Sequence, residues 1–260
     1  MFQQTIALFR FQLPGIINTR IVILLGVILL SGFLGSQFIA ELAIINSEAI
    51  AFAALADYLR YCLVLVVVIS LCFQISQDYE LNQFERLLAM PISRYQYLMA
   101  ETLVLMVLCA FLVIPTWLLL MVIHDAELSV YWACALYLEL VLVGHFALLA
   151  GLSLVKLPVA VIFTLALYVL SKSAPVIDQI LANSSVFYAE ESGFQFSSAL
   201  FTLVRHVLPG SSAFAQNNLL FESVAWIGVL SSQLGAVILY SLFLQAVILV
   251  DFYRREFAAV

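Results

Sequence analysis

The chain has 260 residues, of which 65% are hydrophobic and only 10% are charged, and its mean hydropathy is +1.13. Soluble domains contain about 25% charged residues, so this composition predicts an all-α, polytopic membrane protein. The formal charge of −6 excludes the basic surface of a typical nucleic-acid-binding protein. Membrane spans of about 20 residues would fill the chain and leave no room for a soluble catalytic domain.

Residues 1–20 are expected to form a short amphipathic helix at the cytoplasmic face of the membrane. Apolar side chains recur on one side of it: Phe2, Ile6, Phe9 and Leu13. Pro14 and Gly15 should break this helix before Arg20, where the first span begins. The alternative is that these residues are only the frayed start of the first span.

Six apolar runs predict six membrane spans within a single transmembrane domain that covers residues 1–260. The expected spans are 21–43, 56–76, 102–123, 131–155, 159–171 and 224–250. The fifth run is short for a full crossing. Residues 173–222 are moderately polar but contain amphipathic patches, and we expect short helices there that lie outside the membrane or re-enter it.

The distribution of basic residues predicts that both termini lie in the cytoplasm. With that orientation the inner segments contain Arg10, Arg20, Arg86, Arg94, Lys156, Arg254 and Arg255. The outer segments contain Arg60, Lys172 and Arg205. The excess of basic residues on the inner side obeys the positive-inside rule.

Residues 77–101, QDYELNQFERLLAMPISRYQYLMAE, form a long polar and charged segment between two apolar runs. Apolar residues around Leu87 have helical spacing, and Pro91 should end that helix because it lacks an N–H. Ser93 is a candidate cap for a second helix that begins at Arg94 and continues into the third span. The segment therefore predicts a bent, rigid element at the cytoplasmic membrane surface.

This segment resembles the first cytoplasmic loop of ABC-2 type transporter permeases. The similarity rests on Glu80, Glu85, Leu87, Leu88, Pro91, Ser93, Arg94 and Tyr97. It departs from the family at Asn82–Gln83, where Gly-Thr is frequent, and at Glu101, where a lysine is common. The resemblance implies a coupling helix that docks on an ATPase subunit through Phe84, Glu85, Arg86, Leu87, Leu88, Pro91 and Arg94. The alternative is a solvated loop with ordinary positive-inside arginines.

The resemblance implies the membrane-spanning permease subunit of an ATP-driven exporter in the cytoplasmic (inner) membrane. Two copies, in a homodimer, would pair across the first and fifth spans and form the pathway among membrane lipids. ATP and Mg would be bound by separate ATPase subunits, and periplasmic or accessory proteins could join the assembly. The chain has no Walker A, HExxH or GxSxG motif, which argues against an enzyme and against a cofactor of its own. A non-transporting membrane anchor for a soluble partner is the alternative function.

Two polar residues lie within the predicted fourth span. Glu139 would mark a pathway, a buried partner or a protonation site, because an exposed carboxylate is costly at membrane depth. The alternative places Glu139 close to the outer headgroups. His145 is a candidate pathway residue, and we expect neither a haem nor a metal there. With Glu190–Glu191 these residues are also the basis for a third, less favoured class, an intramembrane enzyme.

The cysteines predict free thiols and no metal site, because they fall inside apolar runs and form no CxxC pair. They are Cys62, Cys72, Cys109 and Cys134.

Overall fold

The computed structural model describes residues 2–42, 46–81, 93–123, 126–154, 156–188 and 226–254. These residues form helices and no strand, which confirms the all-α class. The helices are α1 (Phe2–Ile16), α2 (Thr19–Leu42), α3 (Ser47–Glu80), α5 (Arg94–Ile123), α6 (Ala126–Leu154), α7 (Leu157–Tyr188) and α9 (Trp226–Arg254). Within the described ranges, α2, α3, α5, α6 and α9 are long and apolar enough to cross a membrane, as expected of an integral membrane protein.

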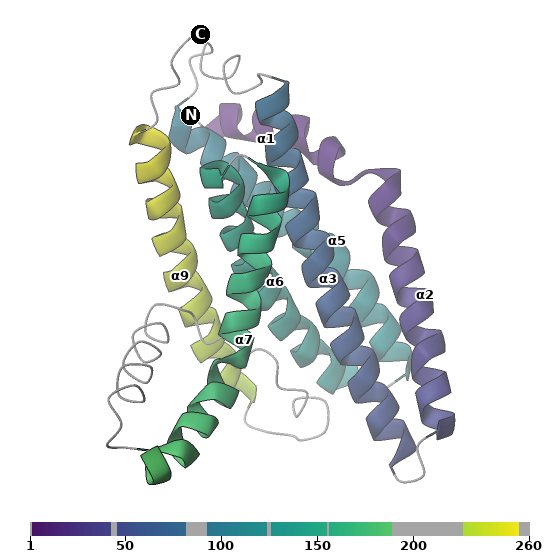
Figure 1. Ribbon diagram of the computed structural model, residues 1–260. Helices are drawn as coiled ribbons and strands as arrows, with labels where there is room; N and C mark the ends of the chain where they lie inside the picture. The colour runs from purple at the N-terminus through teal and green to yellow at the C-terminus, as the bar shows by residue number, and fades with distance from the viewer. Residues whose placement is uncertain are drawn as a thin grey trace.

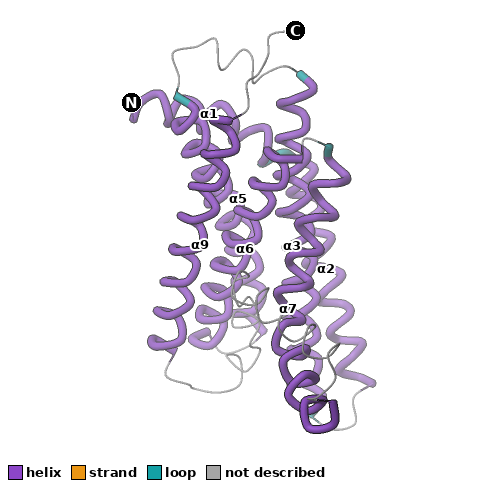
Figure 2. Tube along the Cα trace, turned by 60° about the vertical axis from the view of Figure 1, so that its left-hand side comes forward, coloured by secondary structure: helices purple, strands orange, loops and turns teal. Residues whose placement is uncertain are grey.

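Helix α6 lies at the centre of the bundle and packs against α3, α5, α7 and α9, while α2 packs on the outer side of α3 (Figure 1). The long helices run side by side in both views (Figures 1 and 2). Because α6 touches four neighbours, its side chains are largely shielded, and polar groups on it must find partners inside the protein.

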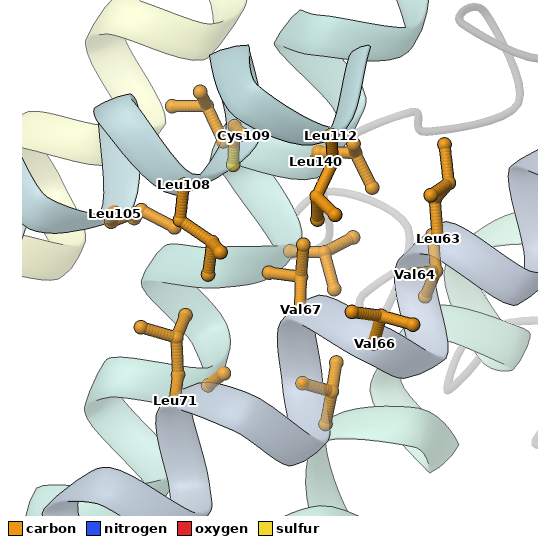
Figure 3. Packing of buried hydrophobic residues seen from close by; sticks show 14 of the residues in the cluster. Leu63, Val64, Val66, Val67, Leu71, Leu105, Leu108, Cys109, Leu112 and Leu140 are labelled. Carbon is orange, nitrogen blue, oxygen red and sulfur yellow. The ribbon is translucent and has the colours of Figure 1, made fainter. Parts of the chain in front are cut away.

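The core is an apolar seam between α3, α5 and α6 (Figure 3). Leu63, Val67 and Leu71 follow one another at i, i+4 spacing on α3 and are fully buried. Gly144 lets α6 approach α5 closely, since a Cβ built there would lie 2.2 Å from Cδ1 of Leu105. Small residues at helix contacts serve this purpose in membrane bundles.

Helix α1 lies across one end of the bundle in both overall views (Figures 1 and 2). It packs against α5 and, more weakly, against α3, and is a helix separate from α2. Residues 2–16 therefore form a helix of their own, while its position at the cytoplasmic membrane surface stays a prediction. The helix continues through Pro14 to Ile16, so the break comes slightly later than expected.

Two predicted boundaries are wrong. Helix α3 begins at Ser47, ahead of the expected start at 56, so Glu48 lies in the first turn of a helix. Helix α7 continues past Lys172 to Tyr188, so the first part of the segment 173–222 prolongs the fifth apolar helix. Residues 189–225 lie outside the described residues. In both places polar residues predict a helix end. A polar side chain, however, does not by itself break the backbone hydrogen bonds of a helix, so both helices continue.

The described basic residues predicted to be cytoplasmic gather at one end of the bundle. They are Arg10 on α1, Arg20 and Arg94 at the starts of α2 and α5, Lys156 before α7, and Arg254 at the end of α9. In Figure 1 these helix ends all lie at the same end as α1.

Candidate functional site

The strongest polar feature of the described residues is an ionic cluster around Glu139, midway along α6. Glu139 is fully buried. Its Oε2 lies 3.2 Å from Nε of Arg60 on α3, and its Oε1 lies 3.0 Å from Nζ of Lys172 on α7. The Tyr168 hydroxyl, also on α7, donates a 2.9 Å hydrogen bond to Oε1. We call Arg60, Glu139, Tyr168 and Lys172 the Glu139 cluster; it joins three helices.

Aromatic rings surround the two cations of the Glu139 cluster. The Arg60 guanidinium lies 5.5 Å from the ring centroid of the buried Trp132. Nζ of Lys172 lies 5.9 Å from the ring of Tyr61 and 5.7 Å from that of Tyr168. Ring faces attract cations, and this attraction strengthens where water is excluded. The rings therefore replace part of the hydration that the two cations lose.

The charges of the Glu139 cluster do not cancel within the buried region. One buried carboxylate faces two cations, and the second carboxylate, Asp57, lies 3.7 Å from Nη1 of Arg60 with its side chain 48% exposed. The Arg60 nitrogens have no well-aligned hydrogen bond in the described part of the chain, so the contact with Glu139 is mainly ionic. Removing one partner from such a group leaves an uncompensated buried charge.

The sequence indicated Glu139 but missed its partners. Arg60 and Lys172 were assigned to outer segments because each lies near one end of an expected span. The structure brings both into the interior, where Glu139 has the buried partners that the sequence allowed for, while its depth in the membrane stays a prediction. The sequence places charges of opposite sign within or beside three apolar runs, but it does not say which of these runs are neighbours.

His145 is the centre of a second buried polar group, which joins α5, α6 and α9. Its Nδ1 lies 2.7 Å from the carbonyl oxygen of Val141, so Nδ1 carries the proton and donates it. Nε2 is then free to accept a hydrogen bond from Nε2 of Gln245 at 3.3 Å. The same Gln245 amide donates to Oγ1 of Thr102 at 3.2 Å.

The structure does not bring Glu139 and His145 together. They are six residues apart on α6, so their side chains point about 120° away from each other around the helix. Each contacts its own set of neighbours. Among the described residues there is no group of three or more His, Cys, Asp and Glu side chains placed to hold a metal ion. The four cysteines are free, as predicted.

Most of the predicted ATPase-coupling residues lie outside the described residues: Phe84, Glu85, Arg86, Leu87, Leu88 and Pro91. Arg94 is described and begins α5, as predicted. Ser93 and Gln96 form a reciprocal cap in which the Ser93 N–H donates to Oε1 of Gln96 at 2.9 Å and the Gln96 N–H donates to Oγ of Ser93 at 3.3 Å. This capping box fixes the start of the helix.

The ends of α3 and α5 that flank residues 82–92 are tied to each other and to α1. The Tyr97 hydroxyl on α5 lies 3.5 Å from Oδ2 of Asp78 on α3. Nε2 of Gln12 on α1 donates a 2.5 Å hydrogen bond to Oε1 of Glu101, which is fully buried. Glu101 is the residue at which the sequence departs from the permease pattern, and here it is the acceptor that holds α1 on α5.

A comparison of the sequence with models of known protein families finds no match, and no curated protein matches it. The resemblance to ABC-2 type permeases therefore rests on the residues of the segment 77–101.

Proposed function

We propose that this chain is the membrane-spanning permease subunit of an ATP-driven exporter of the ABC-2 type. The observation that carries the proposal is the sequence pattern from Glu80 to Tyr97. It lies between the apolar helices α3 and α5, whose adjoining ends are linked by the hydrogen bond from Tyr97 to Asp78. A capped helix that begins at Arg94 and runs to Ile123 supports it, because it joins the proposed docking segment directly to a candidate membrane span.

The proposed topology has six spans, with both termini in the cytoplasm and the chain in the inner membrane. The described basic residues at one end of the bundle support this orientation. Helix α7 is proposed as the fifth of these spans, supported by its apolar stretch Leu157–Ser173 and by the further helix that prolongs it to Tyr188. The rest of the segment 173–222, for which external or re-entrant helices are proposed, lies outside the described residues.

ATP hydrolysis is proposed to take place on separate ATPase subunits that contact residues 84–94. A push on this segment would reach α3 and α5 together, because Tyr97 and Asp78 link their ends, and α1 would follow through Gln12 and Glu101. The Glu139 cluster would pass the movement to α6 and α7, since it joins both helices to α3. The bundle would then tilt as one unit.

The proposed pathway runs between two copies of this chain, which pair across α2 and α7. Helix α2 supports this arrangement because Gly26 and Gly35 have open space around them, and small residues permit close helix contact in a bilayer. Within one copy, Glu139 and His145 are proposed to link helices instead of binding cargo, because Glu139 is already paired with Arg60 and His145 is already hydrogen-bonded to Gln245.

Capture of partners tests the proposal. The full-length chain is tagged in its native host, solubilised in mild detergent and purified, and the proteins that accompany it are identified by mass spectrometry. A nucleotide-binding ATPase subunit is the expected partner, and its MgATP hydrolysis should exceed that of the isolated subunit. A kinase or an oxidoreductase in its place would support the non-transporting anchor instead.

Arg94→Glu then tests where coupling takes place. It should abolish the stimulated ATP hydrolysis of the purified complex while leaving membrane insertion intact. Arg10→Glu is the matched control, because it reverses an exposed charge on α1 outside the resembling segment. Equal stimulation in the wild type and Arg94→Glu would exclude coupling at this position.

A further inference from the structure

A pocket of about 370 Å³ lies where α1, the turn into α2 and the second half of α3 meet. This is within the size range of small-ligand pockets, about 300–1,000 Å³. It lies at the end of the bundle that α1 crosses (Figure 1). Apolar side chains such as Phe11 and Phe73 share its walls with polar ones. The mixed lining suits a ligand that is partly polar and partly apolar.

The inner part of the pocket is rich in acceptors that lack a donor. Gln12 gives its amide N–H to Glu101, which fixes the orientation of the amide and leaves Oε1 as a buried acceptor without a partner. Oε1 of Gln74 is also buried without a partner in the described part of the chain. Asp78 is 9% exposed and, among the described residues, accepts a long hydrogen bond of 3.5 Å from the Tyr97 hydroxyl. Because unpaired buried acceptors are costly, this region favours a ligand with several N–H donors and a positive charge.

The rim of the pocket has the opposite character. Among the described residues that line the pocket, Arg20, exposed in the first turn of α2, is the basic one and Asp78 is the acidic one. A guanidinium binds phosphate through paired N–H groups. The pocket therefore offers a site for a cation inside and a site for an anion at the mouth.

We propose that this pocket binds the phosphoethanolamine headgroup of a membrane lipid. The ammonium lies among Gln12, Gln74 and Asp78, and the phosphate lies against Arg20. A choline headgroup has no N–H to donate, and a phosphoglycerol headgroup has no cation for Asp78, so both should bind more weakly. Phe11, which is 73% exposed on α1, supports a lipid as the source, because α1 then has an apolar side chain at headgroup depth. This inference does not depend on the proposed transport function.

Lipid retention by the full-length chain tests the proposal. The detergent-purified protein is mixed with phosphatidylethanolamine, phosphatidylcholine or phosphatidylglycerol of identical acyl chains, and bound lipid is counted by native mass spectrometry. Phosphatidylethanolamine should be retained about tenfold more strongly than the other two, as expected for hydrogen bonds to a charged group. Equal retention of the three lipids would overturn the proposal and leave water as the occupant.

Two variants locate the binding. Arg20→Gln and Gln74→Leu should each lower the retention of phosphatidylethanolamine about tenfold and abolish its preference over phosphatidylcholine. Arg10→Gln is the control, since Arg10 is an exposed base on α1 that does not line the pocket. Thermal unfolding without lipid checks that both variants are folded. Unchanged retention in folded Arg20→Gln or Gln74→Leu would refute the assignment.

Soluble O-phosphoethanolamine distinguishes a membrane lipid from a free metabolite as the source of the bound phosphoethanolamine group. It should compete only at concentrations far above those of the lipid, because it lacks acyl chains. Competition at equal concentration would show that the pocket takes a free metabolite and would overturn the lipid assignment.

Discussion

The Tyr168 hydroxyl donates a hydrogen bond to the same oxygen of Glu139 that faces Lys172, at 2.9 Å and 3.0 Å respectively. Tyr168 and Lys172 are four residues apart on α7, so they lie on one face of that helix and reach α6 together. With Arg60 on the other oxygen, a single carboxylate joins α3, α6 and α7. The interior of the bundle is therefore held by charge as well as by apolar packing.

Glu139→Gln should be strongly destabilising. The substitution keeps the shape of the side chain but leaves Arg60 and Lys172 buried without a carboxylate between them. Breaking a buried pair in this way costs about 3–5 kcal/mol. Thermal unfolding of the detergent-purified chain measures the effect. Asp57→Asn is the control, because that side chain is 48% exposed and its contact with Arg60 is longer, so we expect a loss below about 1 kcal/mol.

A double substitution should show that the two charges depend on each other. Lys172→Met removes one of the two cations, so Glu139→Gln added to it should cost less than Glu139→Gln alone. Coupling energies between residues in contact are about 0.5–3 kcal/mol. Strict additivity in the same unfolding measurement would mean that Glu139 and Lys172 do not interact in the protein.

Gln12→Leu should loosen α1 from the bundle. The side chain keeps its bulk but cannot donate to Glu101, so the buried Glu101 side chain loses one of its hydrogen-bond donors at a cost of about 1–3 kcal/mol. Limited proteolysis within residues 1–20 should become faster, while cleavage elsewhere stays the same. A proteolysis rate at residues 1–20 equal to that of the wild type would show that apolar packing alone holds α1.

Gly144→Ala should separate α5 from α6. The new methyl group would lie 2.2 Å from Cδ1 of Leu105, and overpacking of this kind costs about 1–3 kcal/mol. Gly235→Ala on α9 is the matched control, because nothing lies within 4 Å of a methyl group there. A lower melting temperature for Gly144→Ala, with no loss for Gly235→Ala, is the expected result.

The helices that the sequence predicted best are those whose ends carry specific signals. Ser93 marked the start of α5 correctly, because a serine followed three residues later by glutamine satisfies two backbone N–H groups. Helix α3 begins at Ser47, ahead of the expected start at 56, because a polar residue such as Glu48 does not end a helix. Residues 49–56 are rich in alanine, a strong helix former, and the charge of Glu48 can stay near the membrane surface.

The candidate site was only partly predictable. An isolated carboxylate such as Glu139 indicates that a partner exists, but single-chain periodicity does not say which helices are neighbours. Arg60 and Lys172 could have been paired with it only by knowing that α3 and α7 both flank α6. Glu101 was recognised as a departure from the permease pattern, but its role depended on the path of α1.

The bond between Gln12 and Glu101 has a consequence for how the protein is made. The two residues are 89 positions apart, so at about 5–20 residues per second Gln12 is synthesised roughly 4–18 s before its acceptor. During that interval α1 has no α5 to pack against, and its apolar side chains need lipid or a chaperone to cover them. Helix α1 is translated before α5 but can reach its final place only after α5 is made, so ribosome-bound chains that stop before residue 101 should still expose α1 to crosslinking.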